Sequence, residues 1–253
     1  MSVVAIIQAR TGSTRLPGKV LLRLEDKTVL EHVILRVEQS KRVDRVVVAT
    51  TDSIVDIKIA ELCKSLGVDC FCGSENDVLD RFYKAAKRFS ADHIVRITAD
   101  CPLMDHEIID QVVGEHLLKQ ADYTSNTIKV TFPDGEDVEV FTFEALEKAW
   151  QEAKLVSERE HVTPFIRGRS DIFTFQSVEN DVDLSSKRWT LDDPEDLEFA
   201  RKIYETLYPQ DNLFGLRKIL DLLEEYPELE QINSHIGRNE GYKKSLREDK
   251  LYG

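Results

Sequence analysis

The residues best suited to chemistry stand in a loop near the N-terminus, residues 8–19 (QARTGSTRLPGK). The loop combines three cations with small residues: Arg10, Arg15, Lys19, Gly12, Ser13 and Gly18. Glycine permits close backbone approach, exposed amides bind anions, and the cations neutralise phosphate charge. The loop therefore predicts a binding site for the phosphates of a nucleoside triphosphate. The alternative, a solvated basic turn, explains this combination less well.

This loop differs from the common phosphate-binding motifs. Gly12 and Gly18 are separated by five residues rather than the four of a P-loop, and Val20 replaces the metal-binding Ser or Thr. The loop also lacks the G-x-G-x-x-G pattern of dinucleotide-binding proteins. The loop therefore predicts a phosphate-binding site that is neither a P-loop nor a dinucleotide-binding motif.

Two aspartates are candidate magnesium ligands. Asp100 directly follows an apolar run at 93–97, and Asp192 stands in the segment 189–196 (WTLDDPED). Carboxylates are the ligands that Mg²⁺ prefers, and the end of a strand places Asp100 beside a phosphate loop. A turn-forming role for Asp100 and a helix-capping role for Asp192 and Asp193 are the alternatives.

The elements around these residues alternate between strand and helix. Apolar strand-like runs at 3–7, 45–50, 68–71 and 93–97 are separated by helical periods at 28–40, 55–66, 78–89 and 105–113. Such alternation predicts an α/β fold with a mostly parallel central sheet flanked by helices. Ligands of these sheets bind beyond the carboxyl ends of the strands, so the loops after Ile7, Thr50, Phe71 and Ile97 are expected on one rim.

The second half of the chain is more mixed. Strict alternation at 137–141 predicts a half-buried, antiparallel strand, followed by helices near 142–154 and 158–168 and a strand at 173–178. Pro194 opens a helix to about Leu207 with Asp193 as its cap, and residues 213–226 are also helical. We expect a single domain, 1–253, with an inserted acceptor-binding and dimerisation subregion at about 121–190 and a helical C-terminal extension at about 210–253.

Composition restricts the partners. The 253 residues carry 34 basic and 47 acidic side chains, a formal charge of −13, which argues against nucleic acid and anionic membranes. The short apolar start resembles a strand rather than a signal peptide, and the four cysteines have no zinc-type spacing. We therefore expect a cytoplasmic protein with reduced thiols.

Together, these motifs resemble a known family. The loop at 8–19, the turn at 100–102 (DCP) and the segment 191–197 (LDDPEDL) occur in this order in sugar cytidylyltransferases, which include the enzymes that activate 3-deoxy-manno-octulosonate and acylneuraminates. Segments 132–140 (FPDGEDVEV), 159–164 (REHVTP) and 188–192 (RWTLD) are similar to the spore coat polysaccharide biosynthesis protein F group. The resemblance spans nearly the whole chain. It implies a Rossmann-like, GT-A-like nucleotidyltransferase fold and transfer of CMP from CTP to an acceptor, with pyrophosphate release.

The resemblance also implies roles for individual residues. Catalysis would depend on Arg10, Lys19, Asp100 and Asp192, with Mg²⁺ held by Asp100 and Asp192. The nucleotide would contact Gln8, Ala9, Arg10, Gly12, Ser13, Arg15, Lys19, Gly73, Ser74, Arg81 and Asp100. The acceptor, a sugar or sugar acid of surface or spore glycan synthesis, would contact Asp137, Glu139, Glu160 and His161. His161 could act as general base or only bind the acceptor. The arginine pattern of acylneuraminate enzymes is not evident.

Two other functions are compatible with the same residues. A nucleotide-sugar-dependent glycosyltransferase has a similar fold, although such enzymes usually hold metal with D-x-D and this chain has Asp100-Cys101-Pro102. A nucleotide-binding protein without catalysis is the second. A symmetric homodimer, through the strand at 137–141 or the C-terminal helices, is compatible with the pattern.

Overall fold

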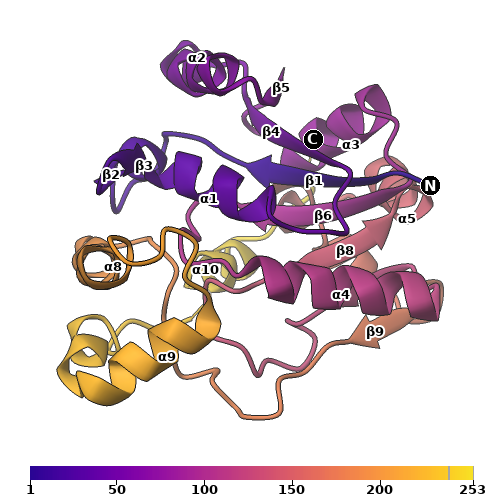
Figure 1. The fold of residues 1–253 in the computed structure, drawn as a ribbon. Helices are drawn as coiled ribbons and strands as arrows, with labels where there is room; N and C mark the ends of the chain where they lie inside the picture. The colour runs from indigo at the N-terminus through magenta and orange to yellow at the C-terminus, as the bar shows by residue number, and fades with distance from the viewer. Residues whose placement is uncertain (239, 253) are drawn as a thin grey trace.

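A seven-stranded sheet with the order β5-β4-β1-β6-β8-β7-β9 forms the centre of the computed structural model, which describes residues 1–238 and 240–252 (Figure 1). The strands are β1 (Val3–Gln8), β4 (Arg45–Thr51), β5 (Asp69–Gly73), β6 (His93–Thr98), β7 (Tyr123–Ser125), β8 (Glu139–Thr142) and β9 (Phe175–Ser177). The first four are parallel to one another, as the alternating pattern predicts. Strand β8 is antiparallel to both β6 and β7, which confirms the expected direction of the strand near 137–141.

Alternate side chains of β1 point to two separate cores. Ala5 and Ile7 pack with helices α1 (Val29–Val37), α2 (Ile57–Leu66) and α4 (His106–Lys119) on one face of the sheet. Val4 and Ile6 pack with α3 (Val78–Arg88), α5 (Phe143–Glu152) and α7 (Pro164–Arg167) on the other. This two-sided burial explains why β1 is a continuous apolar run rather than an alternating one.

A third core lies under the C-terminal helices. Helices α8 (Pro194–Leu207) and α9 (Leu216–Glu225) bury Trp189, Leu191 and Phe214 beside the short hairpin of β2 (Arg23–Leu24) and β3 (Lys27–Thr28). Figure 1 shows α8 and α9, in orange, on the side of the molecule away from α2 and β5. Pro194 begins α8 as predicted, with Asp193 at the N-cap position.

The structure differs from the expected elements at two places. The helix predicted at 158–168 is divided into α6 (Val156–His161) and α7, because Val162 has φ of 71° and Pro164 cannot continue the ladder of the preceding turn. The short strand β7 was not predicted. The C-terminal extension, expected to be helical, contains α9 and α10 (Glu240–Arg247), and Leu251 bridges to Leu155, a pairing that was not predicted.

Three short 3-10 turns complete the described structure: η1 (Lys19–Leu21), η2 (Ile54–Asp56) and η3 (Pro227–Ile232). Within the residues that the structure describes, no helix has the length and apolar character needed to cross a bilayer.

Candidate active site

The loops that follow β1, β4, β5 and β6 share one rim of the sheet, because these strands are parallel neighbours. The predicted phosphate loop follows β1, and Asp100 follows β6 directly beside it. The chain thus brings together the loop cations and the first candidate carboxylate.

The phosphate loop is anchored by a buried carboxylate that sequence reasoning missed. Asp56, which is 2% exposed, accepts hydrogen bonds from the backbone N–H of Thr11 at 2.8 Å and from its hydroxyl at 2.6 Å. Asp56 also accepts a hydrogen bond from the Thr51 hydroxyl at the end of β4. Gly18 adopts a left-handed conformation with φ of 68° and donates its N–H to the Thr11 carbonyl at 3.0 Å, which closes the loop before Lys19.

Lys19 joins the two candidate metal ligands. Its Nζ lies 2.6 Å from Oδ2 of Asp100 and 2.7 Å from Oδ1 of Asp192, and its side chain is 11% exposed. Burial alone would lower the pKa of Lys19, but the two carboxylates offset this and raise it above the ordinary value. Burial also works to raise the pKa of Asp100, yet the charge and hydrogen bond of Lys19 prevail and lower it to about 2. Lys19 and Asp100 are therefore both charged at neutral pH.

Arg15, four residues before Lys19 in the loop, contacts one of these carboxylates and its neighbour Asp193. Its guanidinium lies 2.9 Å from Asp192 and 2.6 Å from Asp193. Arg10 is exposed and lines a neighbouring cavity with Gln8. Two of the three predicted cations, Arg15 and Lys19, thus lie near the carboxylates, while Arg10 lies at the neighbouring cavity.

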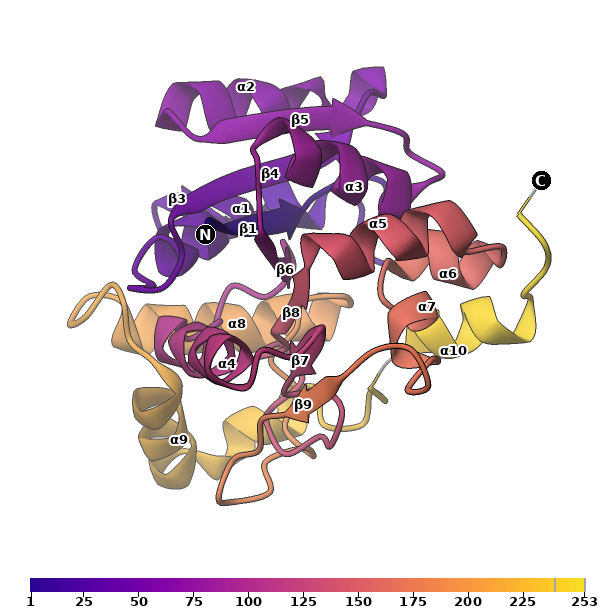
Figure 2. The same ribbon diagram turned by 90° about the vertical axis from the view of Figure 1, so that its right-hand side faces the viewer.

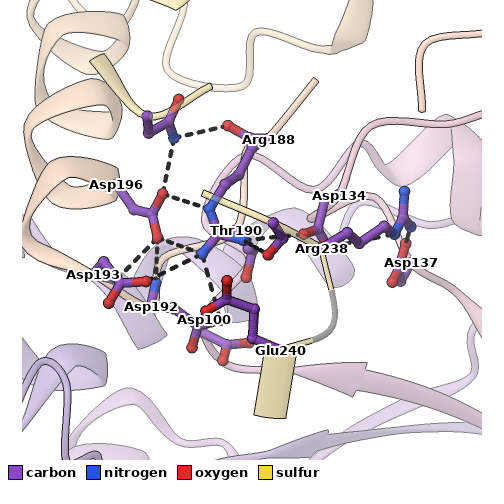
Figure 3. A network of polar contacts seen from close by, with 12 residues as sticks. Asp100, Asp134, Asp137, Arg188, Thr190, Asp192, Asp193, Asp196, Arg238 and Glu240 are labelled. Atoms are coloured by element: carbon purple, nitrogen blue, oxygen red, sulfur yellow. Dashed lines mark hydrogen bonds and ion pairs between the residues drawn. The ribbon is translucent and has the colours of Figure 1, made fainter. Parts of the chain in front are cut away.

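A buried ion-pair network holds Asp192 in place (Figure 3). The guanidinium of Arg188 donates to both carboxylate oxygens of Asp196 at 2.8 and 2.7 Å, and Asp196 accepts the backbone N–H groups of Asp192 and Asp193 at 2.9 Å each. Arg188 also lies 3.3 Å from Asp134. Arg188 and Asp196 stand within the predicted motif segments, but their positioning role was not predicted because nothing in their spacing shows that they meet.

Gly135 lets the segment of Asp134 approach that of Trp189. Its φ is 113°, and a Cβ at this position would lie 2.6 Å from the backbone nitrogen of Thr190. The close approach allows Trp189 N–H to donate to the Asp134 carbonyl at 2.6 Å. The motif at 132–140 therefore supports the loop that carries Asp192.

Two of the predicted acceptor residues lie on the β8 side of the rim and already have partners. Glu139 pairs with Arg96 and accepts hydrogen bonds from the hydroxyls of Tyr123 and Thr163, the latter at 2.6 Å. Asp137 pairs with Arg238 of the C-terminal extension, and burial raises the pKa of Asp137 to about 7 despite this cation. Arg96, Thr163 and Arg238 were not predicted as site residues.

The other two predicted acceptor residues, Glu160 and His161, lie at the end of α6. Glu160 accepts a hydrogen bond from the Ser245 hydroxyl at 3.0 Å, and the His161 ring meets the Tyr242 ring edge-on at 4.9 Å between centroids. Burial lowers the pKa of His161, and within the described residues its Nε2 has no hydrogen-bond partner. A neutral His161 with a free ring nitrogen can bind a hydroxyl group.

A cavity of about 700 Å³ adjoins the start of the phosphate loop. It is lined by Gln8, Arg10, Glu75, Asn76, Val78, Val156, Glu160, His161, Lys250, Leu251 and Tyr252. Its volume falls in the range of small-molecule sites. The predicted residues Gly73, Ser74 and Arg81 support this wall rather than line it: fully buried Arg81 donates to the Ser74 carbonyl at 2.8 Å.

The carboxylates of Asp100 and Asp192 fit a divalent cation. The Nζ of Lys19 contacts both at hydrogen-bond distance, so one oxygen from each converges on a single point. Among the residues that the structure describes, no group of three or more His, Cys, Asp or Glu side chains could hold a metal. Two protein carboxylates with the remaining ligands from phosphate and water is the usual arrangement for Mg²⁺ with a nucleotide.

Comparisons with known proteins identify relatives of this chain. Residues 4–232 match the family model described as cytidylyltransferase. The chain is 45% identical over 248 residues to an uncharacterized protein, MJ1063, of Methanocaldococcus jannaschii, covering 96% of this chain and 98% of that protein. It is 34% identical over 215 residues to the spore coat polysaccharide biosynthesis protein SpsF of Bacillus subtilis, covering 80% and 86% of the two.

A solved structure is similar over nearly the whole fold. The structure of a cytidylyltransferase from Leptospira borgpetersenii superposes with a TM-score of 0.87 at 37% identity, covering 91% of this chain and 97% of that one. The α/β nucleotidyltransferase fold expected from the sequence is thereby confirmed.

Proposed function

Because this chain belongs to the cytidylyltransferase family, we propose that it transfers CMP from CTP to a sugar-type acceptor and releases pyrophosphate. The family membership expected from the motifs is confirmed. The proposal goes beyond the family membership in naming a sugar-type acceptor. The single observation that supports the reaction most directly is the position of Lys19 between Asp100 and Asp192, beside an anchored phosphate loop. This arrangement suits charge stabilisation during transfer of a phosphoryl group.

The chemistry requires little covalent work from the protein. An acceptor oxygen attacks the α-phosphorus, and the bond to the β,γ-pyrophosphate breaks on the opposite side. Arg10, Arg15 and Lys19 would neutralise the charge that the departing pyrophosphate carries. The amide of the exposed residue Gly12 would bind phosphate oxygens in the same loop, whereas the Ser13 amide already donates to the Thr11 carbonyl at 2.9 Å.

Asp100 and Asp192 would hold Mg²⁺, which when bound supplies positive charge to phosphate oxygens. Lys19 must then release at least part of its contact with both carboxylates and turn towards phosphate. Arg188 and Asp196 keep the backbone of Asp192 in place during this exchange.

The acceptor would bind on the β8 side, near Asp137 and Glu139. Their carboxylates are suited to accept hydrogen bonds from sugar hydroxyls. The relative SpsF, named for spore coat polysaccharide biosynthesis, supports a role in the synthesis of a surface or spore glycan.

Pyrophosphate release with CTP, UTP, GTP and ATP, each with a panel of sugar acids and amino sugars, tests the proposal. We expect release with CTP that needs both Mg²⁺ and one acceptor of the panel, and that EDTA abolishes. Sugar transfer from a nucleotide sugar without pyrophosphate would instead indicate a glycosyltransferase. CTP binding without turnover on any acceptor would indicate a nucleotide-binding protein without catalysis.

A further inference from the structure

The C-terminal segment returns to the cavity beside the phosphate loop. Figure 2 shows α10, in yellow, next to α6 and α7, with the end of the chain continuing past α6. Lys250, Leu251 and Tyr252 are among the residues that line the cavity. Since the family model matches only residues 4–232, this wall lies beyond the part of the chain that the model matches.

Specific contacts hold the segment against α6. Asp249 accepts hydrogen bonds from the backbone N–H of Ser157 at 3.0 Å and from its hydroxyl at 2.6 Å. The Lys250 carbonyl accepts the N–H of Val156 at 2.9 Å, and Tyr252 N–H donates to the Lys154 carbonyl at 2.7 Å. The segment is thus paired with residues 154–157 as a short strand would be.

The Tyr252 ring is also fixed from one side. The guanidinium carbon of Arg159 lies 5.3 Å from the centre of this ring, within the range of cation–π contact. Arg159 is itself held by a buried ion pair with Asp77, whose carboxylate its Nε meets at 3.0 Å. Tyr252 therefore has a defined position at the cavity and is not a freely moving terminal side chain.

Apolar surface at this wall remains uncovered. Leu251 is 73% exposed, Tyr252 is 41% exposed, and Leu155, which pairs with Leu251, is 38% exposed. Adjacent exposed apolar side chains at the border of a cavity are typical of a ligand site.

The order of the strands indicates which part of the substrates this cavity receives. In the proposed reaction the α-phosphate would lie near Asp100, which follows β6, and Asp192, with Asp137 and Glu139 on the β8 side. The cavity extends from Gln8 at the end of β1 to Glu75 and Asn76 after β5. Glu160 and His161, predicted from the sequence to bind the acceptor, line this same cavity, where they would contact the nucleoside instead. A triphosphate on the loop at 8–19 therefore places its nucleoside in the cavity and leaves the β8 side to the acceptor.

We propose that Tyr252 and Leu251 form the apolar wall against which the base of the nucleoside triphosphate packs. This inference rests on the proposed function and adds residues of the C-terminal segment to the nucleoside site. An aromatic ring offers a π-face to any base, so Tyr252 contributes affinity, while selection of cytosine falls to polar groups such as Glu75 and Asn76.

Direct binding of CTP, measured by titration calorimetry without acceptor, tests the wall. We expect Tyr252→Ala to weaken CTP binding by about tenfold or more, as loss of base–aromatic stacking does elsewhere. Tyr252→Phe should bind CTP as wild type does, because it keeps the ring. Tyr226→Ala is the matched control: Tyr226 is 43% exposed, close to the 41% of Tyr252, and does not line the cavity.

A second measurement is hydrogen exchange of the backbone amides in the C-terminal segment. CTP should slow hydrogen exchange at residues 249–252 in the wild-type protein, because a bound base covers this segment. An affinity of Tyr252→Ala equal to that of Tyr226→Ala would overturn the inference, even if wild type binds CTP well. Absence of CTP binding by the wild-type protein would overturn the proposed function first, and the inference with it.

Discussion

Lys19 and Asp100, 81 positions apart in the sequence, meet in an ion pair with an Nζ–Oδ2 distance of 2.6 Å. The same ammonium group reaches Asp192 at 2.7 Å, so it occupies the point where both carboxylates converge. A divalent cation bound by these carboxylates would need the same oxygens. In the absence of nucleotide, Lys19 would therefore compete with such a cation.

Replacing Lys19 tests this competition without turnover. We expect Lys19→Met to bind Mn²⁺ about tenfold more tightly than wild type in the absence of nucleotide, since the two carboxylates lose their cation. Electron paramagnetic resonance of free Mn²⁺ measures the affinity. Lys129→Met, at a lysine whose side chain is 69% exposed and paired with Glu179, is the control. Equal Mn²⁺ affinities in all three proteins would show that Lys19 does not occupy the metal position.

The carboxylates themselves should be essential for turnover. We expect Asp100→Asn and Lys19→Ala to reduce the rate of pyrophosphate release at least roughly a hundredfold, as loss of a single electrostatic contact does in other active sites. The melting temperature should change little. Asp221→Asn, at a side chain that is 65% exposed, is the control. If Asp100→Asn released pyrophosphate at nearly the wild-type rate, Asp100 would not have the proposed role in catalysis.

The anchor of the phosphate loop should matter for both stability and binding. Asp56→Ala leaves two hydroxyl groups and the Thr11 N–H without their acceptor, which we expect to lower the free energy of unfolding by about 2–3 kcal/mol. CTP affinity should fall as well, because the loop loses its fixed shape. Urea denaturation and calorimetry measure the two effects. Asp52→Ala, at an exposed position of the same connection, should change neither.

Asp137 predicts a pH dependence of stability. Burial raises its pKa from 3.8 to about 7, so between these values the folded chain keeps a proton that the unfolded chain releases. The free energy of unfolding therefore falls as pH rises through this window, and the loss is complete above the folded pKa. Asp137→Asn removes this dependence.

Relative to wild type, Asp137→Asn should consequently gain about 2 kcal/mol of unfolding free energy between pH 5 and pH 8. Urea denaturation of both proteins at the two pH values provides the comparison. Asp69→Asn, at a side chain that is 49% exposed, serves as the reference. A constant difference between wild type and Asp137→Asn would show that Asp137 is ionised throughout this range.

Local patterns were sufficient for the first half of the fold. The apolar run at β1 and the capping box of Thr28 and Glu31 at the start of α1 are short-range signals, and the structure contains both elements. The pairing of Leu155 with Leu251 could not be predicted in the same way, because residues 248–252 are locally polar and find their partners far along the chain. The three-residue strand β7 is likewise defined by its neighbours rather than by its own sequence.

In the candidate site too, residues with a local sequence signal were predicted and residues that depend on distant partners were not. Lys19 was predicted from its glycine-containing loop and Asp100 from its place after a strand, whereas Asp192 was predicted from its motif and from the helix-capping position of Asp193 beside it. Asp56 and Arg188 were not, because their role depends on burial and on partners that only the folded chain brings close. Sequence patterns thus predict ligand-facing residues well. They predict less well the buried residues that hold the ligand-facing residues in position.

The position of β8 between β6 and β7 has a consequence for synthesis of the chain. A ribosome completes the four parallel strands with residue 98, yet the strand that covers β6 begins only at Glu139. The nascent chain therefore carries β6 as an open edge, which can pair with other chains, for the time needed to make the intervening residues. At that stage the residues of the loop at 8–19 and Asp100 are made or about to be made, while Asp192, the second candidate metal ligand, is still about ninety residues away.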